Sequence, residues 1–151
     1  MTALAAALEA TALAQFLKGS QWVYPLVNAG HLLGIALLVG AVVPLDLTLA
    51  GIVRRVDRVA ATALLRPFAV AGLLLATGCG ALLFITQAGD YARNPLFVAK
   101  IGLIGLAALN AGLHARLAPA NIRLGRALAL VSLALWPLVL LLGRLVGYAL
   151  G

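Results

Sequence analysis

Residues 24–53 read YPLVNAGHLLGIALLVGAVVPLDLTLAGIV, and this stretch decides the fold. Only two ionisable side chains, His31 and Asp46, interrupt its apolar character. A helix needs about 20 apolar residues to cross roughly 30 Å of hydrocarbon, so the stretch predicts a membrane-spanning helix. It is long enough to tilt in the bilayer or to bend near Pro44.

Three further apolar stretches follow, at residues 67–88, 96–117 and 125–150, and the segments between them contain charge, proline or glycine. Of the 151 residues, 64% are hydrophobic and 10% are charged, whereas a soluble domain has about 25% charged residues. This composition excludes a water-soluble monomer, because it cannot cover a globular surface with polar groups. We predict an all-α fold, a four-helix transmembrane bundle in the lipid bilayer that forms a single domain over residues 1–151.

The N-terminal segment differs from a secretory signal peptide, because it lacks a basic beginning and carries Glu9 in its middle. We expect it to stay in the mature protein. Residues 2–18 place Leu4, Leu8, Phe16 and Leu17 on part of one helical face, which indicates a helix lying in the membrane interface. A frayed tail is the alternative for so alanine-rich a segment.

Basic residues are concentrated in two of the three short loops. The middle loop has one arginine, Arg93, opposite Asp90. The other two loops hold Arg54, Arg55, Arg58 and Arg66 in the first and Arg116, Arg123 and Arg126 in the third. The positive-inside rule therefore predicts that loops one and three are cytoplasmic and both termini lie outside. The net charge of +7 does not indicate a nucleic-acid partner, because the basic residues lie between apolar runs.

A charge at the bilayer centre costs at least about 2.5–3.5 kcal/mol, so every ionisable residue at membrane depth is a functional candidate. Counted at about 1.5 Å per residue from the outer edge of each span, these residues form two layers. The outer layer consists of His31, Lys100 and Arg144, and the inner layer of Asp46 and His114.

The first functional hypothesis is a b-type haem in the outer half, serving electron transfer. His31 would be the metal ligand, Lys100 and Arg144 would hold the propionates, and Asn28 and Gly34 would line the ring. The two histidines differ in depth by about 17 Å, so one haem cannot bridge them. The alternatives are that Lys100 and Arg144 reach the interface and that His31 makes a hydrogen bond between helices.

Two other functions remain open. Asp46, Asn110 and His114 would act as relay groups in a transporter of protons or a small solute, although Asp46 could instead pair with a loop arginine or with His114. Alternatively, the chain is an accessory or structural subunit of a larger membrane complex or a homodimer, with glycines such as Gly30 and Gly34 permitting close helix packing. We do not expect a stand-alone enzyme, since no nucleophile with an adjacent base is visible.

One combined pattern resembles a family of small four-span bacterial membrane proteins of unknown function. The residues that carry it are Trp22, Tyr24-Pro25, His31-Leu32-Leu33-Gly34, Gly40, Asp46-Leu47, Gly51, Thr77-Gly78, Phe84, Tyr91, Asn94-Pro95, Phe97, Lys100, Asn110, Ser132-Leu133, Trp136, Gly143-Arg144 and Tyr148. That family is distantly similar to CopD-like copper-resistance membrane domains and to small b-type cytochromes. The resemblance implies the bacterial inner membrane, with periplasmic termini, and a site layer around His31, Asp46, Lys100, Asn110 and Arg144. Thr48 stands where the resemblance implies a basic residue.

Overall fold

The computed structural model describes the backbone of residues 2–150 and the side chains of residues 3–149. Over that range the chain is almost entirely helical and contains no strand. Its seven helices are α1 (Thr2–Glu9), α2 (Ala12–Gly19), α3 (Val23–Ala50), α4 (Arg58–Thr86), α5 (Ala88–Arg93), α6 (Pro95–Leu117) and α7 (Ile122–Leu150). Four of them, α3, α4, α6 and α7, are long and apolar enough to cross a membrane. The predicted all-α, four-span membrane fold is confirmed.

The boundary between the first two spans differs from the one expected. Helix α3 ends at Ala50 rather than at residue 53, because Gly51 adopts the left-handed conformation with φ 84°. Helix α4 begins at Arg58, well before residue 67, because the carboxylate of Asp57 accepts a hydrogen bond from the backbone N–H of Ala60 at 2.8 Å. Pro67 lies inside α4 and does not start it.

The later helices begin at asparagine caps. Asn94 Oδ1 accepts hydrogen bonds from two backbone N–H groups in the first turn of α6, and Pro95 occupies its first position. Asn121 accepts from the backbone N–H of Leu124 at the start of α7. The third and fourth spans therefore begin within a few residues of their predicted positions. The segment between α4 and α6, expected as a turn, contains the short helix α5.

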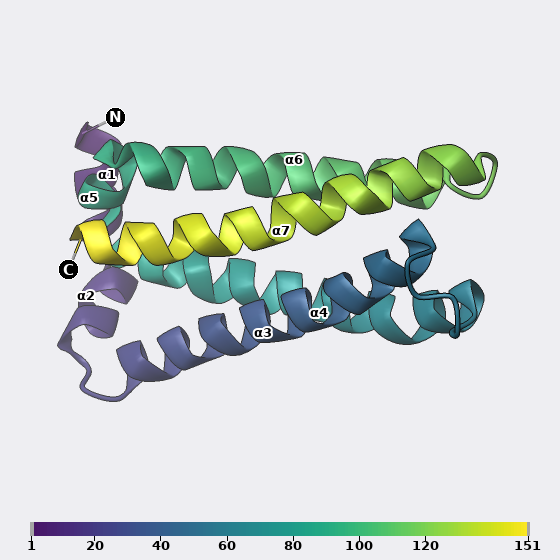
Figure 1. Ribbon diagram of the computed structural model, residues 1–151. Helices are drawn as coiled ribbons and strands as arrows, with labels where there is room; N and C mark the ends of the chain where they lie inside the picture. Colours follow the sequence, from purple (N-terminus) through teal and green to yellow (C-terminus); the bar gives the residue numbers. More distant parts are fainter. Residues whose placement is uncertain (1, 151) are drawn as a thin grey trace.

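The long helices pack in the spatial order α4, α3, α7, α6, so that α3 and α7 are the central pair. Figure 1 shows α7 between α3 and α6 in the middle of the bundle. A hydrophobic core at mid-height joins all four helices. Its buried members are Leu38, Ala41, Val42, Ala69, Ala107, Leu135 and Trp136. This core separates the two ends of the bundle from each other.

The two ends of the bundle are built differently. At one end, α1, α2 and α5 lie across the ends of the long helices, close to the end of α7 (Figure 1). Glu9 fixes α1 there, because its Oε1 accepts a hydrogen bond from the backbone N–H of Gly89 at 2.8 Å. The segment expected as one interfacial helix is therefore two helices with a break at Ala10 and Thr11. The opposite end contains the arginine-rich loops, and we call it the arginine end.

Helices α3 and α4 cross with their backbones in direct contact. A Cβ atom added to Gly34 would lie 2.9 Å from both the Cα of Ala76 and the carbonyl oxygen of Gly72. A Cβ atom on Gly72 would lie 2.8 Å from the carbonyl oxygen of Gly34. Both glycines are needed for this approach, as is usual where membrane helices pack through small residues.

Candidate functional site

His31 lies on α3 and is held against α4. Its Nδ1 donates a hydrogen bond to the carbonyl oxygen of Ala76 at 2.7 Å, because a carbonyl can only accept. The ring lies over Gly80, where an added Cβ atom would be 3.0 Å from Cε1 and 3.2 Å from Nδ1. The hydrogen bond between helices, one of the two interpretations of His31, is present in the structure. Because Nδ1 carries the proton of the neutral imidazole, Nε2 carries none.

Lys100 is the predicted partner that the structure brings to the His31 layer. Its Nζ packs on α7 beside Gly143, 3.2 Å from where a Cβ atom would be. Its charge is close enough to act on the imidazole of His31. Two helix pairs, α3–α4 and α6–α7, thus each contribute one basic side chain to this layer.

The other residues expected in that layer lie elsewhere. Arg144 is exposed and folds back along its own helix, with its guanidinium carbon 4.6 Å from the ring centre of Tyr148 and Nη2 3.3 Å from the Tyr148 hydroxyl. Asn28 is also exposed. Gly34 is buried, but it serves the contact between α3 and α4. Of the residues predicted to hold a haem with His31, Lys100 therefore lies in its layer, whereas Arg144 and Asn28 are exposed and Gly34 packs against α4.

Asp46 is the buried acid of the bundle. Its side chain is 6% exposed, and Oδ2 has no hydrogen-bond partner among the described residues. The hydroxyl of Ser132 on α7 lies close enough to interact with the carboxyl group. The alternative that Asp46 pairs with a loop arginine or with His114 is not seen. Within residues 3–149 Asp46 forms no ion pair, and the ion pair found there joins Glu9 and Lys18, 3.7 Å apart at the other end.

A chain of polar groups leads from Asp46 toward the arginine end. Asn110 on α6 is 6% exposed, and its Nδ2 donates to the carbonyl oxygen of Leu128 on α7 at 3.0 Å. Ser132, which faces Asp46, lies one turn beyond Leu128 on the same helix. His114 lies one turn from Asn110, half-buried, with Nε2 near Gly125 and within the field of Arg66.

The structure links the predicted relay residues through α7, because Ser132 lies beside Asp46 and Asn110 bonds to Leu128 one turn from Ser132. Asp46 on α3, Asn110 and His114 on α6 and Ser132 on α7 form the inner polar cluster. Ser132 was visible in the sequence as a polar residue within the fourth span, but its role depends on α3 and α7 being neighbours. On the other side of Asp46, the hydrophobic core separates the cluster from the layer of His31 and Lys100.

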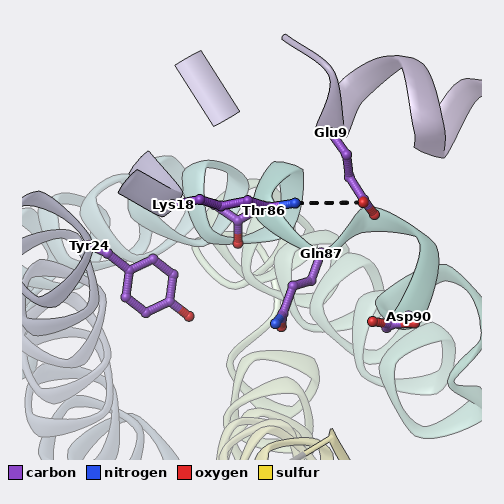
Figure 2. Close-up of a pocket in the computed structure, with 6 residues that line it drawn as sticks. All are labelled: Glu9, Lys18, Tyr24, Thr86, Gln87 and Asp90. Atoms are coloured by element: carbon purple, nitrogen blue, oxygen red, sulfur yellow. Dashed lines mark ion pairs between the residues drawn. The ribbon is translucent and has the colours of Figure 1, made fainter. Parts of the chain in front are cut away.

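Two pockets lie at the ends of the bundle, and their linings do not include His31, Lys100 or Arg144. The pocket at the end of α1 and α2 has a volume of about 510 Å³. Figure 2 shows Lys18 extended toward Glu9, with Tyr24 and Gln87 pointing to one side of this ion pair. Asp90 and Thr86 complete the lining. Sequence reasoning did not anticipate this pocket, since nothing in the chain showed how the N-terminal helices fold over the bundle.

An aromatic cluster lies at the same end of the bundle and joins α4, α5 and α6. Phe84 stacks on Phe97 with ring centres 5.5 Å apart, and Tyr91 tilts against Phe97 at 5.0 Å. Burial, and then the neighbouring Tyr24, raise the pKa of the Tyr91 phenol above its usual 10.0. This phenol therefore stays neutral at ordinary pH.

Comparison of the chain with protein-family models, with curated proteins and with solved structures finds no match. The resemblance to a four-span bacterial family thus stays a prediction. Among residues 3–149, no group of three or more His, Cys, Asp or Glu side chains is placed to hold a metal ion.

Proposed function

We propose that this membrane protein transports protons and that Asp46 binds the proton in transit. One observation carries the proposal: Asp46 Oδ2 is buried within a membrane helix and has no hydrogen-bond partner among the described residues. A bare carboxylate in such surroundings is costly, and a proton or cation compensates it. A side chain kept at that cost is a functional candidate, because a simple packing role would be met better by an apolar residue.

The surroundings of Asp46 support a route to the arginine end. Ser132 can both donate and accept a hydrogen bond, and Asn110 and His114 continue the polar chain along α6. Neutral imidazoles and carboxyl groups are frequent members of proton relays in membrane proteins. The proposed proton therefore exchanges between Asp46 and water at the arginine end.

The hydrophobic core blocks the opposite direction in this conformation. Leu38, Val42 and Trp136 lie between the inner polar cluster and the layer of His31 and Lys100. The proposed cycle therefore requires a second conformation in which this core opens toward His31. Such a conformation need be only a minor population, as in other two-state carriers.

The test is proton flux into proteoliposomes that contain a pH-sensitive dye, driven by a potassium diffusion potential. We expect the wild type to acidify the lumen and Asp46→Asn to abolish the flux, because asparagine has nearly the same shape but carries no exchangeable acidic proton. Asp90→Asn, which removes a carboxyl group outside the inner polar cluster, is the matched control. Flux that is unchanged in Asp46→Asn would overturn the proposal and leave the cluster with a structural role.

The distribution of arginines also predicts an orientation of the chain in the membrane. We propose that the arginine end faces the cytoplasm of a bacterial cell and that both termini face the periplasm, by the positive-inside rule. In a Cys79→Ser background, Ala120→Cys at the arginine end should be protected from an impermeant thiol reagent in whole cells. Gln21→Cys at the opposite end should be labelled. The reverse pattern would contradict this orientation.

Binding of b-type haem through His31 stays a second candidate because of one observation. Ligand histidines donate their second ring N–H to a carbonyl or carboxylate, as Nδ1 of His31 does to Ala76. Lys100 is the nearby cation for a propionate, whereas Arg144 and Asn28 have no part in this site. Protein purified from haem-replete cells should then show a Soret band that is lost in His31→Ala. A colourless wild type would reject this candidate.

A further inference from the structure

The second pocket lies at the arginine end and has a volume of about 580 Å³. Four of its lining residues are arginines, Arg54, Arg55 and Arg58 around the first loop and Arg126 from α7. They come from two sequence regions that the fold brings together. The centre of this convergence is Gly51, where a Cβ atom would lie 3.4 Å from Nη2 of Arg58 and 3.7 Å from Nε of Arg126.

The charges of these arginines are not balanced within the protein. Within residues 3–149, none of the four guanidinium groups forms an ion pair. Arg54 donates to the carbonyl oxygen of Gly51 at 3.2 Å, which orients its guanidinium beside the end of α3. Asp57 also lines the pocket, but its carboxylate already accepts from the backbone N–H of Ala60. The pocket therefore has positive charge and free N–H donors to offer to an anion.

Exposed apolar side chains lie beside the same arginines, on the loop after α3 and in the first turn of α4. Ile52 is 60% exposed, Val56 49% and Val59 76%. A segment in water gains nothing from displaying three β-branched apolar residues beside arginines. A segment at the boundary between headgroups and acyl chains does, because the aliphatic side chains enter the hydrocarbon while the guanidinium groups stay among the phosphates.

We propose that this pocket binds the phosphate group of an anionic phospholipid. Arginine suits this ligand, since its planar guanidinium donates two parallel hydrogen bonds to phosphate oxygens. Basic pockets between membrane helices are a recurrent way to hold an anionic headgroup. The lipid would bridge α7, which carries Ser132, to the loop that follows α3, the helix that carries Asp46.

The experiment is a titration of the intact protein in maltoside micelles with dioleoyl phosphatidylglycerol, with the bound lipid counted by native mass spectrometry. Each arginine near an anionic headgroup contributes about 1 kcal/mol, which corresponds to about fivefold in affinity. We therefore expect Arg58→Gln combined with Arg126→Gln to bind this lipid about 25-fold more weakly.

The matched control is Arg116→Gln combined with Arg123→Gln, which removes the same charge at the same end but outside the pocket lining. Its affinity should stay within about twofold of the wild type, because neither side chain lines the pocket that is proposed to hold the phosphate. Equal weakening of the two double variants would overturn the pocket assignment.

Two arms with the wild type keep the test decisive even if a variant does not fold. Dioleoyl phosphatidylcholine should not be retained, and 10-fold more inorganic phosphate should not displace phosphatidylglycerol. Displacement by inorganic phosphate would show that the pocket takes a free anion, and retention of phosphatidylcholine would show that headgroup charge is irrelevant. Either result overturns the assignment to an anionic lipid.

Discussion

Replacing Gly34 with alanine tests the closest contact of the bundle. The new Cβ atom would lie 2.9 Å from the Cα of Ala76 and from the carbonyl oxygen of Gly72. Non-bonded heavy atoms normally stay about 3.5 Å apart or more. The backbones of α3 and α4 must therefore separate by at least about 0.6 Å, since neither contacting atom belongs to a flexible side chain.

Such overpacking costs about 1–3 kcal/mol, and the higher helix propensity of alanine returns up to about 1 kcal/mol. We expect Gly34→Ala to lower the free energy of unfolding by about 1–2 kcal/mol. Gly40 is the control on the same helix, because an added Cβ atom there meets no described atom within 4 Å. Gly40→Ala should be neutral or slightly stabilising.

The measurement is equilibrium unfolding in mixed micelles of dodecyl maltoside and sodium dodecyl sulfate, followed by far-ultraviolet circular dichroism. Gly34→Ala should unfold at a lower dodecyl sulfate fraction than Gly40→Ala. If the two variants unfold together, the close backbone approach of α3 and α4 is refuted.

Three more predictions concern the end of the bundle covered by α1 and α2. Asn94→Ala removes the cap of α6 and should lower the free energy of unfolding by about 1 kcal/mol in the same assay, whereas Asn94→Asp should retain most of it. The phenol of Tyr91 has a higher pKa in the folded protein than in the unfolded chain. Its contribution to the free energy of unfolding is therefore complete below pH 10 and declines as the pH rises above that value. The free energy of unfolding of Tyr91→Phe should therefore decrease less steeply than that of the wild type as the pH rises above 10. An unchanged pH profile would count against the burial of this phenol. Glu9→Ala removes the hydrogen bond to Gly89 and should accelerate amide hydrogen exchange in α1 without affecting α7; equal protection in both proteins would contradict the docking.

The four spans could be predicted because each satisfies a simple length and polarity requirement. Their ends were harder to predict. Pro67 suggested a start for the second span, yet Asp57 caps the helix earlier, and proline is tolerated within a membrane helix when neighbouring groups satisfy the freed carbonyl. The N-terminal helix was expected as well, but not its division into α1 and α2 or its contact with α5.

The candidate site was predictable in its residues and not in its contacts. Asn28 and Asp46 are separated by five full helical turns, a spacing that puts them on one face of α3, yet one is exposed and the other buried. The reason is that the neighbours of α3 change along its length, so one face meets different surroundings at different heights. The Asp46 and Ser132 contact likewise depends on which helices are adjacent, a long-range property that residue spacing does not contain.

The order in which the helices pack has a consequence for biogenesis. The hydrogen bond of His31 closes within the hairpin of α3 and α4, and that of Asn110 within the hairpin of α6 and α7. The carboxyl group of Asp46, by contrast, meets Ser132 only when the two hairpins join. While the ribosome is still making the second hairpin, this acid has no protein partner, so the nascent chain must shelter it at the translocon or keep it near water until α7 arrives.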